Sequence, residues 1–387
     1  MKSLGGAGLI SLAVAFPPVI RVNAYWEQRH PEMVGSAKER ALARVWNANG
    51  APADDPFAVA MSPYLSDPYR GTLARRFLAE GQTALDLEFE AATKALTAAG
   101  LSPGDIDLTM VSSFLPDQPG VGNAAFLAKR LELRGNAWNF ESACAGAMVG
   151  LQNACAQVKA GFAKRVLVVV SCSYSRVLDE TDTMIWSVGD GAAAFVVGEV
   201  PEGEGVLSVH GLHTAETCGA MEYHLEPDPS GRVNHRMRAS QSGGKALRET
   251  AAPYLVECAE GAMAKASISS VNDVDFFITT TPMAWYSKFC ASVLGYDLRK
   301  TIDTHACYAN TGPVMVPTNL HAAASAGRLH RGDTVLLYAV GSVSSRSAAV
   351  LRWGDVKLGP SPDPEIRSSF VSRGSSGPGA HDLRLPG

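Results

Sequence analysis

The sequence reads DIDLTMVSS at residues 105–113 and DVDFFITTT at residues 273–281. Each copy begins with two acidic residues around a β-branched one, continues into an apolar run and ends in hydroxyl residues. Short apolar runs with polar boundaries are typical of buried strands. Because the two copies start 168 residues apart in a chain of 387, the sequence predicts a duplicated unit of about 170 residues per half.

Two further pairs share nearly the same offset. They are SACAGAM (142–148) with NTGPVMV (310–316), and RVLVVVSCS (165–173) with TVLLYAVGS (334–342). An Ala-rich strand follows each of the last two, GAAAFVVGE (191–199) and SAAVLRWGD (347–355). Each half therefore reads as strand, helix, strand, strand, with Ala-rich helices expected at 151–160 and 320–326. Two such halves predict layered α/β sheets that share a central helical layer.

Composition excludes several function classes. With 34 Lys and Arg against 38 Asp and Glu, the net charge of −4 leaves no basic face for nucleic acid and no polybasic membrane patch. The seven cysteines form no CxxC pair and no zinc-ligand spacing, which favours reduced thiols in a cytoplasmic protein without a metal. Small or carrier-bound ligands fit this composition better.

The first residues imitate a secretory signal, since Lys2 precedes an apolar run from Leu4 to Phe16. The run continues into Pro17 and Pro18 without a polar break, so we interpret it as the opening core strand and turn. No segment reaches the ~18 apolar residues of a membrane span.

Cys144 lies in NFESACAGAM (139–148), where a strand-like approach ends in small residues and a helical pattern begins. A thiol at a helix N-terminus is expected to have a lowered pKa, as a nucleophile needs. The alternative is a small buried cysteine, which is the commoner case for a single thiol. In a duplicated fold the equivalent turns can meet, so we expect Cys144 and residues 310–312 to face one pocket.

From about residue 8 to 354 the chain resembles the thiolase superfamily, specifically its ketoacyl-ACP synthase III branch. The resemblance rests on ACAG around Cys144, GDGAAAFVVGE (189–199) and YANTG (308–312). It implies a duplicated five-layered αβαβα fold. We divide the chain into an N-terminal half at 1–200, a C-terminal half at 201–356 and, because of its Pro, Ser and Gly clusters, a flexible tail at 357–387. It also implies a homodimer, with a heterodimer as the alternative, and acylation of Cys144 by acyl-CoA or a phosphopantetheinyl acyl carrier protein, without a permanently bound cofactor.

The resemblance also implies an oxyanion hole made by the backbone N–H of Cys144 and one from residues 341–343, taken as Ser342. The family usually has consecutive glycines in that loop, whereas this chain has Ser342 and Val343. Glycine permits backbone angles that valine does not, so the loop geometry is expected to differ.

The family's catalytic histidine is missing. It normally follows the strand read here at 274–278, in a segment of the form Pro-His-Gln-Ala-Asn, whereas this chain has TTTPM at 279–283. Thr280 therefore takes the histidine's place. In the family, His and Asn stabilise the enolate formed when a malonyl thioester loses carbon dioxide. Threonine offers one hydrogen bond but is neither a base near neutral pH nor a cation.

Two polar residues remain candidates beside Cys144 and Thr280. Asn310 matches the family's asparagine, whose amide can hold a thioester oxygen, although Asn before Thr and Gly also forms turns. His305 is the nearest histidine in sequence and either substitutes as a base or is a satisfied core residue. We rank eight other polar residues lower. Three histidines are expected in surface loops, two residues in a loop after the first repeat strand, and three arginines on a solvated helix face or at the entrance of the site. They are, in that order, His213, His224 and His235, then Asp117 and Gln118, then Arg70, Arg75 and Arg76.

The leading hypothesis is an acyltransferase of specialised, polyketide-type metabolism. Cys144 would take an acyl group from a thioester and pass it to an oxygen, nitrogen or carbon atom of a small-molecule acceptor. One alternative is a condensing enzyme that forms a carbon–carbon bond with Asn310 and Thr280, or His305, in altered roles. The other is a non-catalytic partner subunit of a heterodimeric ketosynthase.

Overall fold

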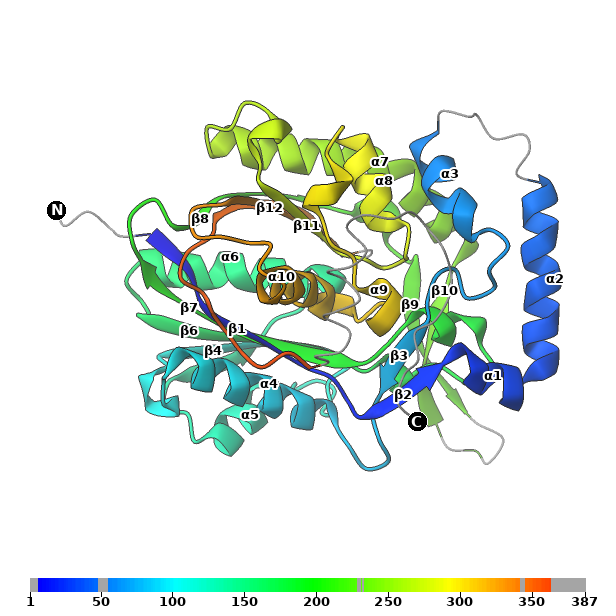
Figure 1. Ribbon diagram of the computed structural model, residues 1–387. Coiled ribbons are helices and arrows are strands. Elements are labelled where there is room, and N and C mark those ends of the chain that lie inside the picture. Colours follow the sequence, from blue (N-terminus) through cyan, green and yellow to red (C-terminus); the bar gives the residue numbers. More distant parts are fainter. Residues whose placement is uncertain (1–5, 48–54, 228–230, 232, 342–344, 363–387) are drawn as a thin grey trace.

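The computed structural model describes residues 6–47, 55–227, 231, 233–341 and 345–362. The elements stack in five layers, in which two sheets enclose a central pair of helices and carry further helices on their outer faces (Figure 1). This arrangement confirms the predicted duplicated αβαβα fold. Among the described helices, none is long and apolar enough to cross a membrane.

The first sheet has the strand order β14-β1-β7-β6-β4-β5. Its strands are β1 (Gly6–Ala15), β4 (Leu108–Phe114), β5 (Asn136–Asn139), β6 (Arg165–Cys172), β7 (Gly191–Val200) and β14 (Lys357–Leu358). The second sheet has the order β11-β12-β13-β8. Its strands are β8 (Gly205–His213), β11 (Phe276–Thr279), β12 (Thr334–Val340) and β13 (Ser345–Arg352).

The helices fill three layers. The central layer holds α6 (Gly146–Lys159) and α10 (Met315–Ser325), the first sheet is covered by α4 (Ala84–Ala99) and α5 (Ala124–Leu131), and the second by α7 (Gln241–Lys265) and α8 (Tyr286–Val293). Smaller elements gather at one end of the molecule (Figure 1). They are β2 (Val19–Val22), α1 (Asn23–Arg29), α2 (Pro31–Asn47), α3 (Pro56–Met61), β3 (Ala74–Phe77), β9 (Met221–Pro227), β10 (Val233–Ala239) and α9 (His305–Tyr308).

The duplication holds at the level of strand pairing. In the first half β4 pairs parallel to β6, and β6 pairs antiparallel to β7; in the second half β11 pairs parallel to β12, and β12 pairs antiparallel to β13. Each set closes with a further antiparallel strand, β1 on β7 and β8 on β13. The predicted internal repeat therefore corresponds to two copies of one topology.

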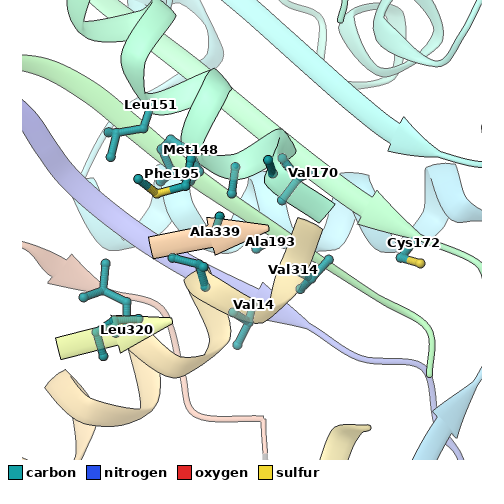
Figure 2. Packing of buried hydrophobic residues seen from close by; sticks show 14 of the residues in the cluster. Val14, Met148, Leu151, Val170, Cys172, Ala193, Phe195, Val314, Leu320 and Ala339 are labelled. Atoms are coloured by element: carbon teal, nitrogen blue, oxygen red, sulfur yellow. The ribbon is translucent and has the colours of Figure 1, made fainter. Parts of the chain in front are cut away.

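The central helices pack between the sheets through apolar side chains. Figure 2 shows Met148 and Leu151 of α6 near Phe195 of the first sheet, with Leu320 of α10 in the same cluster. All four side chains are buried. Both helices begin five residues earlier than the 151–160 and 320–326 predicted, because the small residues of each preceding turn are already helical.

The tail predicted at 357–387 is wrong in its first residues. Lys357 and Leu358 form β14, which pairs parallel to β1, and the Gly359 N–H donates to the Leu12 carbonyl at 2.9 Å. These contacts join the end of the chain's second half to the first sheet. Residues 363–387 lie outside the described residues.

The predicted helix face with exposed arginines is also wrong. Arg75 and Arg76 lie on β3, and Arg75 is fully buried. Its guanidinium donates to the Trp186 carbonyl and to Asn23 Oδ1, and it lies 4.7 Å from the centre of the Trp26 ring. Burial lowers the pKa of Arg75 to about 9. Its role is therefore structural, since it joins β3 to the segment around Trp186.

The remaining polar candidates also hold structure. Asp117 accepts hydrogen bonds from the Ala84 and Leu85 amides and so caps α4. His224 and His235 lie on the exposed hairpin of β9 and β10, not in loops. The sequence analysis assigned this segment to loops because it is rich in Gly, Pro and charged residues, although MEYHLE at 221–226 alternates apolar and polar residues as a strand does.

A buried carboxyl fixes the ends of two central strands. Glu88 on α4 accepts hydrogen bonds from the hydroxyls of Ser113, on β4, and Ser171, on β6, and from the Asn123 amide. Burial raises the pKa of Glu88 despite these bonds. Because Ser113 and Ser171 lie close to the ends of their strands, this network joins α4 to the carboxyl ends of β4 and β6.

We predict that Glu88→Gln is more stable than the wild type at pH 8 and equal to it near pH 4. The folded protein holds the Glu88 proton above the ordinary glutamate pKa of about 4.3, whereas the unfolded chain releases it, so the wild type loses stability as pH rises. Urea unfolding at the two pH values measures the difference. A Glu90→Gln variant, on the exposed side of the same helix, is the control; a pH-independent difference between Glu88→Gln and wild type would contradict the prediction.

Candidate active site

Cys144 lies where the sequence placed it, in a turn between a strand and a helix. β5 ends at Asn139, a short 3-10 turn covers Ala143–Ala145, and α6 begins at Gly146. Ala143 has a φ of +46°, an uncommon conformation for a residue with a side chain. Backbone strain of this kind is concentrated at functional sites, and here it immediately precedes the candidate nucleophile.

The equivalent turn of the second half packs directly against this one. It comprises Asn310, Thr311 and the 3-10 turn Gly312–Val314, which leads into α10. A Cβ added at Gly146 would lie 2.7 Å from Ser112 Oγ and 3.2 Å from Pro313 Cβ. The absence of a side chain at Gly146 therefore helps the two turns to approach this closely. The two turns meet as expected, whereas a pocket shared by Cys144 and residues 310–312 stays a prediction.

The electrostatics around Cys144 differ from the expectation of a lowered pKa. The residue is 8% exposed, and burial raises the pKa of its thiol to about 11, with a smaller increase from the Glu141 carboxylate. A hydrogen bond with Tyr174 acts in the opposite direction. The expected effect of the helix N-terminus is outweighed, because the sulfur is shielded from water and the charge beside it is negative.

Tyr174 is the residue at this site that the sequence analysis missed. Its hydroxyl lies 4.0 Å from the sulfur of Cys144. It follows β6 by two residues, and the carboxyl ends of strands are where α/β proteins gather functional side chains. That position was the available signal. Its ring belongs to an aromatic group with Phe114 and Tyr223, at ring-centre distances of 5.4 Å from Phe114 to Tyr174 and 5.9 Å from Phe114 to Tyr223.

Asn310 is anchored by its main chain. Its N–H donates to the Ser187 carbonyl, and its carbonyl accepts from Gly189, both at 2.9 Å. The side-chain Oδ1 accepts from the Gly312 amide at 2.9 Å, as in an Asx turn. Asn310 therefore forms the turn, and its amide nitrogen is the atom it has to offer a ligand.

Thr280 is fully buried at the end of β11, where its N–H donates to the Tyr338 carbonyl at 3.0 Å. Within the described residues its hydroxyl has no hydrogen-bond partner. A buried hydroxyl without a partner is uncommon and calls for an explanation. The neighbouring β12 ends at Val340, and the next residue, Gly341, packs on the nucleophile turn.

Both ring nitrogens of His305 are occupied within the protein. Nδ1 lies 2.8 Å from the Thr281 carbonyl and Nε2 lies 3.0 Å from Thr72 Oγ1. The residue is fully buried, and burial lowers its pKa to about 4. These contacts favour the interpretation of His305 as a core histidine that joins β11 to the segment before β3.

Ser342, the second expected oxyanion residue, lies outside the described residues. Its neighbour Gly341 contacts the nucleophile turn closely, since an added Cβ there would lie 2.7 Å from the Ser142 carbonyl oxygen and 3.1 Å from Ala145 Cβ. Ser142 Oγ and Ser345 Oγ are 2.7 Å apart. The two ends of this loop are therefore held against the turn that carries Cys144.

A cavity of about 280 Å³ has Ser187 and Met283 in its wall. The Ser187 carbonyl accepts a hydrogen bond from the Asn310 N–H, and Met283 follows Thr280 by three residues. The lining is Ala37, Arg40, Pro68, Tyr69, Arg70, Asp182, Thr183, Met184, Trp186, Ser187 and Met283. The cavity thus has both cationic and aromatic side chains next to the candidate site.

The chain matches known proteins over both halves. Residues 139–214 match the family described as 3-oxoacyl-[acyl-carrier-protein (ACP)] synthase III, and residues 263–353 match the C-terminal family of the same enzyme. The β-ketoacyl-[acyl-carrier-protein] synthase III of Sinorhizobium medicae is 33% identical over 294 residues, covering 73% of this chain and 89% of that protein. The enzyme of the same name from Ruegeria pomeroyi is 32% identical over 289 residues, covering 73% and 88%.

Solved structures agree with this match. The β-ketoacyl-[acyl carrier protein] synthase III of Thermus thermophilus has a TM-score of 0.72 at 25% identity, covering 90% of this chain and 99% of that one. A cysteine-to-serine variant of Xanthomonas campestris OleA, solved with lauric acid and lauroyl-CoA, has a TM-score of 0.72 at 20% identity, covering 91% and 100%. With the duplicated fold and the nucleophile turn already in place, these matches establish that the chain belongs to the β-ketoacyl-[acyl-carrier-protein] synthase III family.

Proposed function

We propose that this protein is an acyltransferase of specialised, polyketide-type metabolism that works without decarboxylation. Cys144 takes an acyl group from an acyl-CoA or acyl carrier protein thioester and passes it to an oxygen, nitrogen or carbon nucleophile of a small-molecule acceptor. One observation supports the proposal: Cys144 lies in a turn between a strand and a helix, whereas Thr280, at the position where the resemblance implies a histidine, is fully buried.

Transfer and condensation make different demands on that position. Acyl transfer requires a thiol nucleophile and donors for one oxyanion. Decarboxylation of a malonyl thioester also generates an enolate, which in the family is held by His and Asn together. Thr280 supplies at most one neutral donor. Cys144, Asn310 and the 341–343 loop therefore suffice for the first reaction but lack a partner for the second.

The donor would enter through the cavity beside Asn310. Its lining includes Arg40 and Arg70, and guanidinium groups recognise phosphates such as those of coenzyme A or a phosphopantetheine arm. Ser187 joins the cavity wall to Asn310 through one hydrogen bond. The cavity's position thus supports a thioester arm that reaches the turn carrying Cys144.

The family match favours a second candidate, a condensing enzyme that forms a carbon–carbon bond with Asn310 and Thr280 in altered roles. A non-catalytic partner subunit is the third candidate, motivated by the missing histidine.

The protein is proposed to act as a homodimer through the edge strand β5. This edge carries Trp138, 41% exposed, and neighbours Val121, 66% exposed, whose carbonyl accepts a hydrogen bond from Asn139.

We predict that purified protein gains one acyl mass from a panel of acyl-CoA and acyl carrier protein thioesters, as measured on the intact chain. The adduct should be absent from Cys144→Ala. It should persist in Cys218→Ala, because Cys218 is the exposed cysteine and the control for non-specific acylation. An adduct that survives Cys144→Ala, or none at all, rules out both enzymatic candidates.

We predict that Thr280→His gains decarboxylation. With labelled malonyl thioester, wild type should release carbon dioxide no faster than Cys144→Ala. Thr280→His should release it at least about tenfold faster than wild type, since general acid–base groups typically raise reaction rates by 10²–10⁴. Thr280→Val, which keeps the shape and removes the unpartnered hydroxyl, is the matched control. Release by the wild type at the rate of product formation would establish the condensing enzyme instead.

We predict that His305 is a source of acid instability, not a base. The pKa of His305 in the folded protein is about 4, below the ordinary 6.5. The contribution of neutral His305 to the free energy of unfolding is therefore complete above pH 6.5. It is lost as the pH falls toward 4, by ~3 kcal/mol at most. Urea unfolding at pH 7.5 and pH 5 should show a smaller pH effect in His305→Gln than in wild type. His330→Gln, at an exposed histidine, should match wild type. Loss of Cys144 acylation in His305→Gln with an unchanged pH effect would contradict the structural role.

A further inference from the structure

We propose that Tyr174 is a catalytic residue of this site, whose hydroxyl donates a hydrogen bond to the sulfur of Cys144 and stabilises its thiolate where the family's histidine is missing. The inference rests on the proposed function in one respect, that Cys144 is the nucleophile. It assigns the reacting sulfur a partner from the 3-10 turn that follows β6, in the first half of the chain, whereas Thr280 belongs to the second half.

The geometry of the hydroxyl supports this assignment. Tyr174 is 1% exposed, and its Oη lies 4.0 Å from Cys144 Sγ. Within the described part of the chain, that sulfur is the only hydrogen-bond partner of the hydroxyl. A buried tyrosine hydroxyl normally has a partner, and here the partner is the candidate nucleophile itself. Catalytic hydrogen bonds are often long in the unliganded enzyme and shorten when substrate binds.

The position of Tyr174 is fixed by its main chain and by one neighbouring ring. Tyr174 opens a 3-10 turn, and its carbonyl accepts from Val177 and Leu178 at 3.1 Å each. The next residue, Ser175, donates its amide to the buried Asp190 carboxylate at 2.9 Å. The Phe114 ring meets the Tyr174 ring edge to face. A main chain fixed in this way and a ring packed on one side keep the hydroxyl directed at the sulfur.

The acid–base properties define its role as a donor. Burial raises the pKa of Tyr174 well above its usual range, so the phenol keeps its proton at physiological pH. The hydrogen bond from Tyr174 lowers the pKa of Cys144, in opposition to burial. An O–H group that donates to a thiolate makes a charge-assisted bond, which is stronger than its bond to the neutral thiol. Tyr174 therefore favours the reactive form of Cys144 without acting as a base.

The acylation step then balances without a histidine. The S–H bond of Cys144 breaks and its sulfur bonds to the acyl carbon. The Cys144 proton passes to solvent water as the thiolate forms. The bond between the acyl carbon and the donor sulfur then breaks, and the departing thiolate takes up a proton from water. Tyr174 retains its own proton throughout and only stabilises the thiolate before attack.

The test measures the thiolate directly. In a Cys218→Ala background, the rate of Cys144 alkylation by iodoacetamide is followed from pH 6 to 11 by peptide mass spectrometry. Because the thiolate is the minor form over most of this range, Tyr174→Phe should slow alkylation about tenfold at each pH from 6 to 9, the effect of one hydrogen bond to a charged group. A profile in Tyr174→Phe that coincides with wild type would overturn the proposal.

Tyr223→Phe is the matched control. Tyr223 packs on the same Phe114 ring, but its hydroxyl bonds to the sulfur of Met237 at 3.4 Å, not to Cys144. Its removal should leave the alkylation profile unchanged. An equal shift in both variants would mean that the aromatic group acts only by packing, and would also overturn the proposal.

A second substitution keeps the test decisive if Tyr174→Phe does not fold, as judged by circular dichroism. Incorporation of 3-fluorotyrosine at position 174 preserves the ring and makes the hydroxyl a stronger donor, so alkylation should be faster over the same pH range; an unchanged rate overturns the proposal. Alkylation needs no thioester. An alkylation profile that depends on Tyr174, in a protein that forms no acyl adduct, would support this inference and refute the proposed function. An acyl adduct on Cys144 with an alkylation profile that does not depend on Tyr174 would support the proposed function and refute this inference.

Discussion

The close contact between two glycine-containing turns, one from each half of the chain, is the constraint on which the rest of the site depends. Gly146 approaches Ser112 and Pro313 so closely that any side chain would collide with them. Gly312 has a φ of +57°, and a Cβ there would lie 3.1 Å from Cys172 Sγ. Because the turns are locked in this way, the turn that carries Cys144 packs against the turn at Gly312–Val314, although more than 160 positions separate them in the chain.

This locked centre is also poorly hydrated, and burial dominates its electrostatics. Burial raises the pKa of Cys144 to about 11, that of Asp190 to about 6 and that of Asp303 to about 7. The nearest carboxylate to the thiol, Glu141, opposes ionisation. A site of this kind cannot rely on a free thiolate in the resting state. Neutral donors such as the Tyr174 hydroxyl and backbone amides become the means by which charge on sulfur or oxygen is stabilised.

Membership of the β-ketoacyl-[acyl-carrier-protein] synthase III family and the departures from it are therefore compatible. The chain keeps a cysteine in a turn between a strand and a helix, and a second turn from Asn310 onward. Thr280, at the position where the resemblance implies a histidine, is buried, and both ring nitrogens of His305 are engaged by Thr72 and Thr281. These features support the proposed acyl transfer, since transfer does not require an enolate to be held.

The sequence alone determined the duplicated fold, the strand-to-helix turn at Cys144 and the missing histidine, because periodicity and small-residue turns are local properties that repeat at a fixed spacing. It did not reveal that Arg75 is buried, that Lys357 and Leu358 form a strand or that Tyr174 meets Cys144. Each depends on partners far along the chain: Trp186 for Arg75, Ser11 and Leu12 for β14, and a turn 30 residues earlier for Tyr174. The thiol pKa was also beyond the sequence, since burial of a sulfur is decided by everything packed around it and not by the helix it precedes.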